Sequence, residues 1–264
     1  MDALYNRIGN NYNYMRRADP YIAARIAGFL DNPAGKVLDI GCGTGNYTIA
    51  VSEKGWQLTG ADPSEKMLNV ARQRDPSINW VTAAAENLPF ENNTFDAAFG
   101  TVTLHHWTSL EKGFAELFRV LKAGARLIIF STTAEQTSTY WLAHYFPQMI
   151  KRSVEHESSY EMIFNAALSA GFDVLEPENY FVRPDLQDKF MYSGKDDPEI
   201  YFDEDFRKGI SSFANLSDPQ EVEAGLALLR SDLQNGEFAR VRQAYENNTG
   251  DYVFVRAVKP APHS

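Results

Sequence analysis

The chain has 264 residues, enough to bury the core of one elaborated domain or of one domain and a smaller lobe. Its formal net charge of −10 disfavours a nucleic-acid partner, because binding to a phosphate backbone depends on Lys and Arg. No apolar run approaches the roughly 18 residues of a membrane span, no secretory signal is visible, and the single cysteine cannot form an internal disulfide. We therefore expect a cytoplasmic protein without a membrane span.

The first thirty residues are predicted to be helical, and Asp19 is suited to cap a helix that begins with Pro20. From residue 36 onward, short apolar strands alternate with helices, which is the pattern of a parallel sheet with helices on both faces. The predicted strands cover residues 36–40, 57–61, 79–83, 95–100, 126–131, 172–182 and 252–258. The predicted helices that follow the first one cover residues 46–53, 64–73, 110–120, 159–170 and 221–233.

The regular alternation of strands and helices ends after Ser131. We predict an α/β fold with a doubly wound, mostly parallel sheet, in which a helical cap is inserted before the last strand. Residues 35–182 and 250–260 would form the core that binds a cofactor. Residues 1–34 would form an N-terminal helical lid, and residues 183–249 would form the cap on the substrate side.

A glycine-rich turn follows the first predicted strand of this core: Gly41-Cys42-Gly43-Thr44-Gly45. Glycines permit unusual backbone angles and let a ligand approach the main chain closely. In an open α/β sheet, ligands bind beyond the carboxyl ends of the strands, which is where this turn lies. Three glycines at alternate positions are more than a plain tight turn requires. The segment is therefore predicted to bind a nucleotide-type cofactor.

The residues around this turn discriminate between cofactors. The dinucleotide fingerprint needs glycine at its sixth position, where Asn46 stands, and the Gly-Lys of a phosphate-binding loop is missing. Asp39 would be an awkward neighbour for a pyrophosphate, but it suits a ligand that carries a sulfonium and an ammonium group. Asp62, at the end of the second strand, could accept both hydroxyl hydrogens of a ribose, although it could also simply cap the next helix. Together they favour S-adenosylmethionine over NAD.

Five segments in order resemble the motifs of class I S-adenosylmethionine-dependent methyltransferases, and among them the type 11 small-molecule enzymes similar to those of ubiquinone and menaquinone biosynthesis. The resemblance covers roughly residues 35 to 131. It implies a Rossmann-like methyltransferase fold, a methyltransferase activity and S-adenosylmethionine as cofactor. The five segments are residues 37–45, 62–68, 84–90, 95–106 and 117–124.

Carried over residue by residue, the resemblance implies that Gly41 and Gly43 lie against the methionine part of the cofactor, with Asp39 near its amino group. Asp62 would hold the ribose. Met67 would lie on the adenine face, although an apolar residue of this kind could equally be part of the core.

Three further cofactor contacts follow from the same resemblance. Ala85 and Glu86 would lie at the adenine edge, and Thr101 would lie near the methionine part. The chain departs from the pattern at Ala84, because many relatives have an Asp there that accepts a hydrogen bond from the adenine amino group. A methyl group cannot accept that bond, so Glu86, a backbone carbonyl or water would have to replace it.

Two histidines follow the fourth of these strands, at the rim where a substrate would lie. His105 or His106 could act as a general base for the methyl acceptor, and we expect His106 to be the one that faces the active site. They could instead form a packed loop beside Trp107. No His or Cys cluster with zinc spacing and no carboxylate set for magnesium is evident, so no metal is predicted.

The predicted function is transfer of a methyl group from S-adenosylmethionine to a small, apolar or aromatic organic molecule. Residues 140–213 are rich in aromatic side chains, which could line a pocket for such a substrate or could form the core of the cap. One alternative is an NAD(P)-dependent oxidoreductase. Another is a non-catalytic protein that binds S-adenosylmethionine or S-adenosylhomocysteine. The sequence leaves the acceptor atom and the oligomeric state open.

Overall fold

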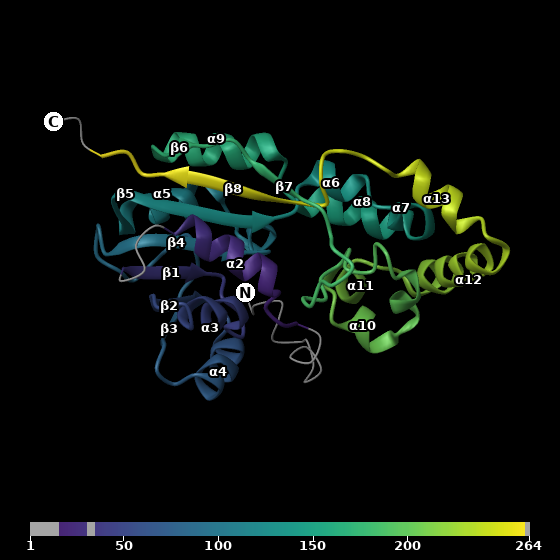
Figure 1. Cartoon of the computed structure of the whole chain (residues 1–264), viewed down its shortest axis with the longest axis horizontal. Coiled ribbons are helices and arrows are strands. Elements are labelled where there is room, and N and C mark those ends of the chain that lie inside the picture. The colour runs from purple at the N-terminus through teal and green to yellow at the C-terminus, as the bar shows by residue number, and fades with distance from the viewer. Residues whose placement is uncertain (1–15, 31–34, 262–264) are drawn as a thin grey trace.

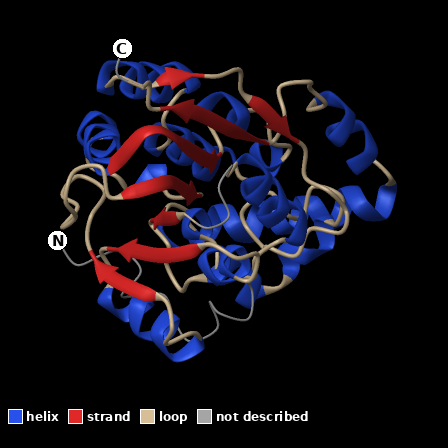
Figure 2. Cartoon of the chain, turned by 60° about the vertical axis from the view of Figure 1, so that its left-hand side comes forward, coloured by secondary structure: helices blue, strands red, loops and turns tan. Residues whose placement is uncertain are grey.

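The computed structural model describes residues 16–30 and 35–261, in which a central sheet has helices on both faces (Figures 1 and 2). In these residues the sheet has eight strands in the order β3-β2-β1-β4-β5-β8-β6, and β7 pairs with β8 beside this path. β1 to β5 run parallel, whereas β8 pairs antiparallel with β5, β6 and β7. The strands are β1 (Lys36–Ile40), β2 (Gln57–Asp62), β3 (Asn79–Thr82), β4 (Phe95–Thr101), β5 (Leu121–Ser131), β6 (Asp173–Val174), β7 (Glu178–Tyr180) and β8 (Tyr252–Val258).

The helices form two groups. Those that cover the sheet are α2 (Pro20–Phe29), α3 (Asn46–Ser52), α4 (Glu65–Arg74), α5 (Leu110–Val120) and α9 (Tyr160–Ala170). The others gather beyond the end of the sheet where β5 ends, and we call them the cap helices (Figure 1). They are α6 (Ala134–Ser138), α7 (Leu142–Tyr145), α8 (Pro147–His156), α10 (Glu204–Lys208), α11 (Ser211–Asn215), α12 (Pro219–Asn235) and α13 (Phe238–Ala244). Two short 3-10 helices are η2 (Leu104–His106) and η3 (Pro198–Phe202).

Successive residues of the inner strands point to opposite faces of the sheet. In β1, Val37 packs in one hydrophobic cluster with Ile26 of α2 and Val51 of α3. Leu38, the next residue, packs in a second cluster with Phe114 of α5. β1 is thus buried on both faces over residues 37–40, and Asp39 is the one polar residue of that stretch. The predicted doubly wound, mostly parallel α/β fold is confirmed.

Two strand predictions differ from the structure. Residues 172–182 were expected to form one strand, but β6 and β7 are separate because Pro177 lies between them and has no N–H to donate to a neighbouring strand. β5 begins at Leu121 rather than at Arg126. A register irregularity between Phe95 and Ala97 of β4 accommodates the additional residues of β5.

The cap helices come from two stretches of the chain. Residues 183–249, predicted to be the cap, lie between β7 and β8, whereas α6, α7 and α8 lie between β5 and α9. The stretches contact each other, α7 with α12 and α8 with α11. We propose that both belong to the substrate side. Of the predicted lid, residues 1–15 and 31–34 lie outside the described part of the chain, and α2 packs on α3 and β5.

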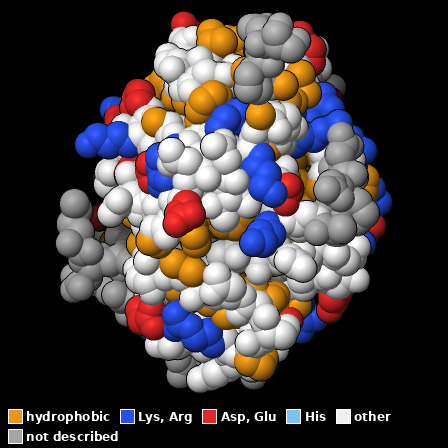
Figure 3. Space-filling view, turned by 90° about the vertical axis from the view of Figure 1, so that its left-hand side faces the viewer, with side chains coloured by type: hydrophobic (Ala, Val, Ile, Leu, Met, Phe, Trp, Pro, Cys, Tyr) orange, Lys and Arg blue, Asp and Glu red, His pale blue; other side chains and the backbone are white. Residues whose placement is uncertain are grey.

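Figure 3 shows the end of the molecule opposite the cap helices, where basic and acidic side chains of the described residues lie interspersed. None of the helices that the structure describes is long and apolar enough to span a membrane.

Candidate active site

The glycine-rich turn leaves β1 and is fastened to the neighbouring strand, because the N–H groups of Gly41 and Cys42 donate to the Ala61 carbonyl at 2.8 and 3.1 Å. Gly41 and Gly43 have φ angles of 70° and 54°, which favour glycine. A Cβ at Gly41 would lie 1.9 Å from the Thr103 hydroxyl oxygen, whereas a Cβ at Gly43 would meet no atom within 4 Å. Gly41 is therefore needed for packing, and Gly43 faces open space from which a ligand can approach the main chain.

Asp39 lies at the carboxyl end of β1, buried beneath this turn. Its Oδ2 accepts a hydrogen bond from the Thr48 hydroxyl at 2.6 Å, while its buried Oδ1 has no hydrogen-bond partner. Burial raises the pKa of Asp39 to about 7, against the opposing effect of the Thr48 hydrogen bond, and the negative charge of Asp62 raises it further. A buried acceptor without a partner is costly, and the ammonium group of a ligand would donate the missing hydrogen bond, while a sulfonium would add a nearby positive charge. The residues present thus fit the predicted cofactor.

Asp62 ends β2 and braces the glycine-rich turn. Its Oδ2 accepts from the Gly43 N–H at 2.9 Å, and its Oδ1 accepts from the Ser64 N–H at 2.8 Å. Burial raises the pKa of Asp62, and these two hydrogen bonds oppose that shift. Ser64, rather than Asp62, caps α4, since its hydroxyl accepts from the Met67 N–H. A carboxylate has about four lone-pair sites, so Asp62 can also accept hydrogen bonds from a ribose.

Of the residues expected around the adenine, two are buried and the third is hydrogen-bonded to the loop before α5. Met67 and Ala85 are buried, and Met67 belongs to neither hydrophobic cluster of the core. Glu86 is engaged in the protein, because its Oε1 accepts from the Thr108 hydroxyl at 3.0 Å and from the Ser109 N–H at 3.2 Å. This carboxylate holds the loop before α5. Its contact with adenine stays a prediction.

β4 ends at Thr101, and the chain then turns sharply. Val102 has a φ of 49°, which is unfavourable for a β-branched residue and costs about 1–3 kcal/mol. Its N–H donates to the Phe130 carbonyl at 2.7 Å, which holds the turn in place. The turn brings Thr103 against Gly41 and directs His105 toward a cavity. Thr101, predicted to lie near the methionine part, is half-buried here.

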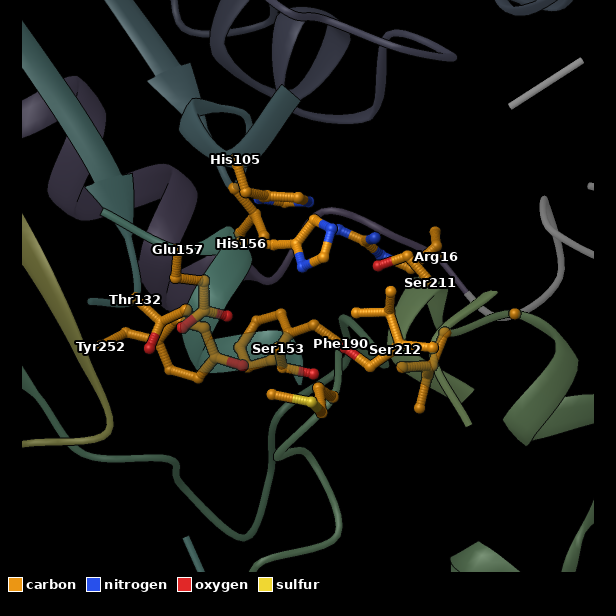
Figure 4. A pocket seen from close by; sticks show the side chains of 15 residues that line it. Arg16, His105, Thr132, Ser153, His156, Glu157, Phe190, Ser211, Ser212 and Tyr252 are labelled. Carbon is orange, nitrogen blue, oxygen red and sulfur yellow. The ribbon is translucent and has the colours of Figure 1, made fainter. Parts of the chain in front are cut away.

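A cavity lies between the carboxyl end of the sheet and the cap helices (Figure 4). Its wall combines apolar side chains, among them Phe190 and Met191, with polar and charged ones. The polar and charged side chains of the wall are Arg16, His105, Thr132, Ser153, His156, Glu157, Ser211, Ser212 and Tyr252. Of these, only His105 is among the site residues predicted from the sequence. The described residues contain no group of three or more His, Cys, Asp or Glu side chains arranged to hold a metal ion.

The two histidines of η2 differ in position. His105 lines the cavity, whereas His106, which we expected to face the active site, is not among the described residues of its wall. Their rings lie 3.8 Å apart. Burial holds the pKa of His105 well below 6.5, and the electrostatic effects of His106, Arg16 and His156 lower it further. Burial, with a smaller effect of Arg16, lowers the pKa of His106 to about 4, so both rings are neutral at pH 7.

A buried ion pair joins the N-terminal segment to the segment that precedes η3. The Arg16 guanidinium donates to both oxygens of Asp188, and the Tyr47 hydroxyl donates to Asp188 Oδ2 at 3.1 Å. The Arg16 carbonyl accepts from the Asn46 side chain at 3.1 Å, directly after the glycine-rich turn. Arg16 therefore connects the turn with the wall of the cavity.

We expect Asp188→Ala to lower the free energy of unfolding by about 3–5 kcal/mol, because it removes the buried carboxylate that accepts from both the Arg16 guanidinium and the Tyr47 hydroxyl. Urea unfolding measures the change. The matched control is Asp185→Ala, which removes a surface carboxylate paired with Arg183 and should cost about 0–1 kcal/mol. Equal losses of unfolding free energy in the two variants would show that the buried ion pair contributes little to stability.

Comparison with known proteins supports this arrangement. Residues 38–129 match a family described as a methyltransferase domain. The chain is 34% identical over 137 residues to a demethylmenaquinone methyltransferase of Clavibacter sepedonicus, covering 48% of this chain and 56% of that protein. It is 30% identical over 131 residues to a malonyl-[acyl-carrier protein] O-methyltransferase of Serratia marcescens, covering 49% of this chain and 51% of that protein. The chain thus spans about half the length of these curated relatives.

A solved structure covers more of the chain. It is that of a protein described as a methyltransferase from an antibiotic biosynthesis pathway of Anabaena variabilis, with a TM-score of 0.80 and 29% identity. The similarity covers 92% of this chain and 98% of that one, so it includes the cap helices as well as the sheet. Residues 38–129 of the chain are therefore a methyltransferase domain of the S-adenosylmethionine-dependent class.

Proposed function

We propose that the protein transfers a methyl group from S-adenosylmethionine to a small organic molecule held in the cavity beside His105. Two observations at the glycine-rich turn carry this proposal together: the buried, unpartnered Oδ1 of Asp39 and the open space at the Cβ position of Gly43. The names of the curated relatives support methyl transfer as the reaction class, and they differ in substrate.

The cofactor supplies an electrophilic methyl group on a positively charged sulfur when it is bound. In the proposed complex, Asp39 binds the amino group and Asp62 binds the ribose. Gly43 lets the methionine part reach the main chain, beside Thr101. Met67 lies on the adenine face, with Ala85 and Glu86 at its edge. Much of the rate enhancement then comes from alignment and the exclusion of water, which the cap helices provide.

The wall of the cavity supports a substrate with an apolar or aromatic body. Phe190, Met191 and Tyr252 offer apolar and aromatic surface, and Phe190 lies with its ring centroid 4.4 Å from that of Tyr252. His105 is neutral at pH 7, so its ring can donate or accept a hydrogen bond that orients the substrate.

Calorimetry and labelling test the proposed function. S-adenosylmethionine and S-adenosylhomocysteine should bind, whereas NADH should not. A metabolite extract incubated with the protein and methyl-labelled S-adenosylmethionine should yield a product that is one labelled methyl heavier. Binding of NADH alone would favour an oxidoreductase. Binding of S-adenosylhomocysteine without any labelled product would favour a non-catalytic binding protein.

His105→Gln is expected to lower the rate of label transfer about tenfold or more, because the variant loses a ring that lines the cavity. The affinity for S-adenosylhomocysteine should stay the same. His106→Gln is the matched control, and it should retain most of the rate. If the rate of label transfer falls only in His106→Gln, then His106 and not His105 acts on the substrate.

A further inference from the structure

Glu157 follows α8 as its C-terminal capping residue and lines the cavity. Its Oε2 is buried and has no hydrogen-bond partner. The hydroxyl of Thr137 contacts the carboxyl group by a hydrogen bond. An ionised carboxyl group is costly to bury unless it is paired or hydrogen-bonded, so a carboxyl placed in this way is suited to receive a partner from a ligand.

Apart from that of Thr137, the hydroxyl groups of Thr132 and Tyr140 near Glu157 are engaged in other hydrogen bonds. The Thr132 hydroxyl lies 3.2 Å from that of Thr137 and 2.9 Å from that of Tyr140. The Tyr140 hydroxyl in turn donates to the Asp251 carbonyl. Figure 4 shows the Glu157 side chain directed into the space bounded by Thr132, His156 and Tyr252. The open side of the carboxyl therefore faces the interior of the cavity.

Several titratable groups face this carboxyl from the surrounding elements. Burial raises the pKa of Tyr140 and Tyr252, so both stay neutral near pH 7. His105, His156 and Arg16 line the same cavity, and Arg16 is bound to Asp188. Burial raises the pKa of Glu157 to about 8, with the Thr137 hydrogen bond acting in the opposite direction. A carboxyl of this kind exchanges its proton close to neutral pH, where a general base is most effective.

We propose that Glu157 binds the methyl acceptor through a hydroxyl or amino group and takes the proton of that group. The O–H or N–H bond of the acceptor breaks, and an O–H bond forms on the Glu157 carboxylate. The acceptor atom uses the freed electron pair to bond the methyl carbon, whose former bonding pair stays on sulfur. Glu157 then releases its proton to solvent. This inference rests on the proposed function, and it assigns to Glu157 the base role that the sequence suggested for a histidine.

The position of Glu157 relative to the cofactor turn supports the assignment. Thr103 packs against Gly41 of the turn, and His105, two residues later, lines the cavity that contains Glu157. The cavity therefore begins next to the methionine end of the proposed cofactor site. A solely structural role for Glu157 would be the attachment of α8 to Thr137, which an amide side chain could also provide.

The decisive variant is Glu157→Gln, which keeps the size of the side chain and can accept from Thr137 but cannot ionise. Glu155→Gln is the matched control, since Glu155 lies two residues earlier on the same helix and is exposed. Both variants should bind S-adenosylhomocysteine with the affinity of the unaltered protein. Label transfer from the metabolite extract should rise about tenfold per pH unit below pH 8 in the control and level off above it. Glu157→Gln should be about a hundredfold slower and lack this rise.

A second measurement needs no knowledge of the natural acceptor. The protein is labelled with ¹³C at the Glu carboxyls and saturated with S-adenosylhomocysteine. The carboxyl resonance that is present in the unaltered protein and absent from Glu157→Gln then belongs to Glu157. Benzyl alcohol and benzylamine are the probes, and toluene is the matched compound without a donor. At least one of the two donor probes should bind about fivefold more tightly than toluene and change the pKa of the Glu157 carboxyl. The probe that binds more tightly shows whether Glu157 prefers a hydroxyl or an amino group.

Two results separate failure of this inference from failure of the proposed function. A Glu157 titration that neither donor probe moves, in a protein that binds S-adenosylhomocysteine, overturns the assignment of Glu157. Label transfer by Glu157→Gln with the rate and pH profile of Glu155→Gln overturns it as well. Absence of both cofactor binding and label transfer in the unaltered protein would instead reject the proposed function.

Discussion

Gly43→Ala is expected to lower the affinity for S-adenosylhomocysteine about a hundredfold, or by about 2.7 kcal/mol, in a protein that remains folded. A Cβ at this position would meet no protein atom within 4 Å, so it would occupy the space from which the ligand approaches. The φ of 54° makes alanine less favourable there, at a cost of about 1–2 kcal/mol in stability. Calorimetry measures the affinity, and urea unfolding measures the stability.

Two other glycines serve as controls for this result. Gly55 has a φ of 105° and open space around its Cβ position, but it lies before β2, at the amino end of the strands. Gly55→Ala should therefore show a backbone penalty without loss of binding. Gly41→Ala should be the least stable of the three, because its Cβ would lie 1.9 Å from Thr103. If Gly43→Ala binds as tightly as Gly55→Ala, the cofactor does not approach the main chain at Gly43.

Asp39→Asn should change stability and cofactor affinity in opposite directions. Folding raises the pKa of Asp39 from 3.8 to about 7, so the folded state holds this proton more tightly than the unfolded state does. The free energy of unfolding therefore falls as the pH rises from about 4 to about 7, at up to about 1.4 kcal/mol per pH unit. The neutral amide removes this effect. We expect the variant to be about 1–3 kcal/mol more stable than the unaltered protein at pH 8, after allowing for an amide N–H left without a partner.

The same substitution should weaken binding of S-adenosylhomocysteine about ten- to a hundredfold, because hydrogen bonds to charged groups contribute about 1.5–3 kcal/mol. An ammonium group beside Asp39 favours its ionised form. Binding near pH 7 should therefore release a proton from the unaltered protein but not from the variant, and calorimetry in buffers of different ionisation enthalpy measures this difference. A variant that loses stability at pH 8 and keeps its affinity would contradict both expectations.

The cofactor turn could be predicted because its determinants are local in the sequence. An apolar strand, alternate glycines and a following helix are contiguous, and parallel strands end at the same edge of a sheet. Asp39 and Asp62 therefore had to lie near each other. The competing explanation for Asp62, a helix cap, failed because a serine two residues later fills that position. Glu86 was harder to place, since the groups that its carboxylate holds lie 22 and 23 residues further along the chain.

The cavity could not be predicted, because its wall is assembled from distant segments without a periodic pattern. Arg16 and Asp188 are 172 residues apart in the sequence, and no motif connects them. Glu157 ends a helix of the cap, where the hydrophobic pattern reports packing and not the direction of a polar side chain. The choice between His105 and His106 depended on the unusual backbone of Val102, which a β-branched residue gives no reason to expect.

The position of β8 has a consequence for how the protein is made. This strand lies inside the sheet, with β5 on one side and β6 and β7 on the other, yet it is the last of the eight to be synthesised. Until residues 252–258 have left the ribosome, one edge of β5 has unpaired N–H and C=O groups and can pair with other chains. Stalled or truncated translation products should therefore be aggregation-prone, even though they already contain every residue of the cofactor turn.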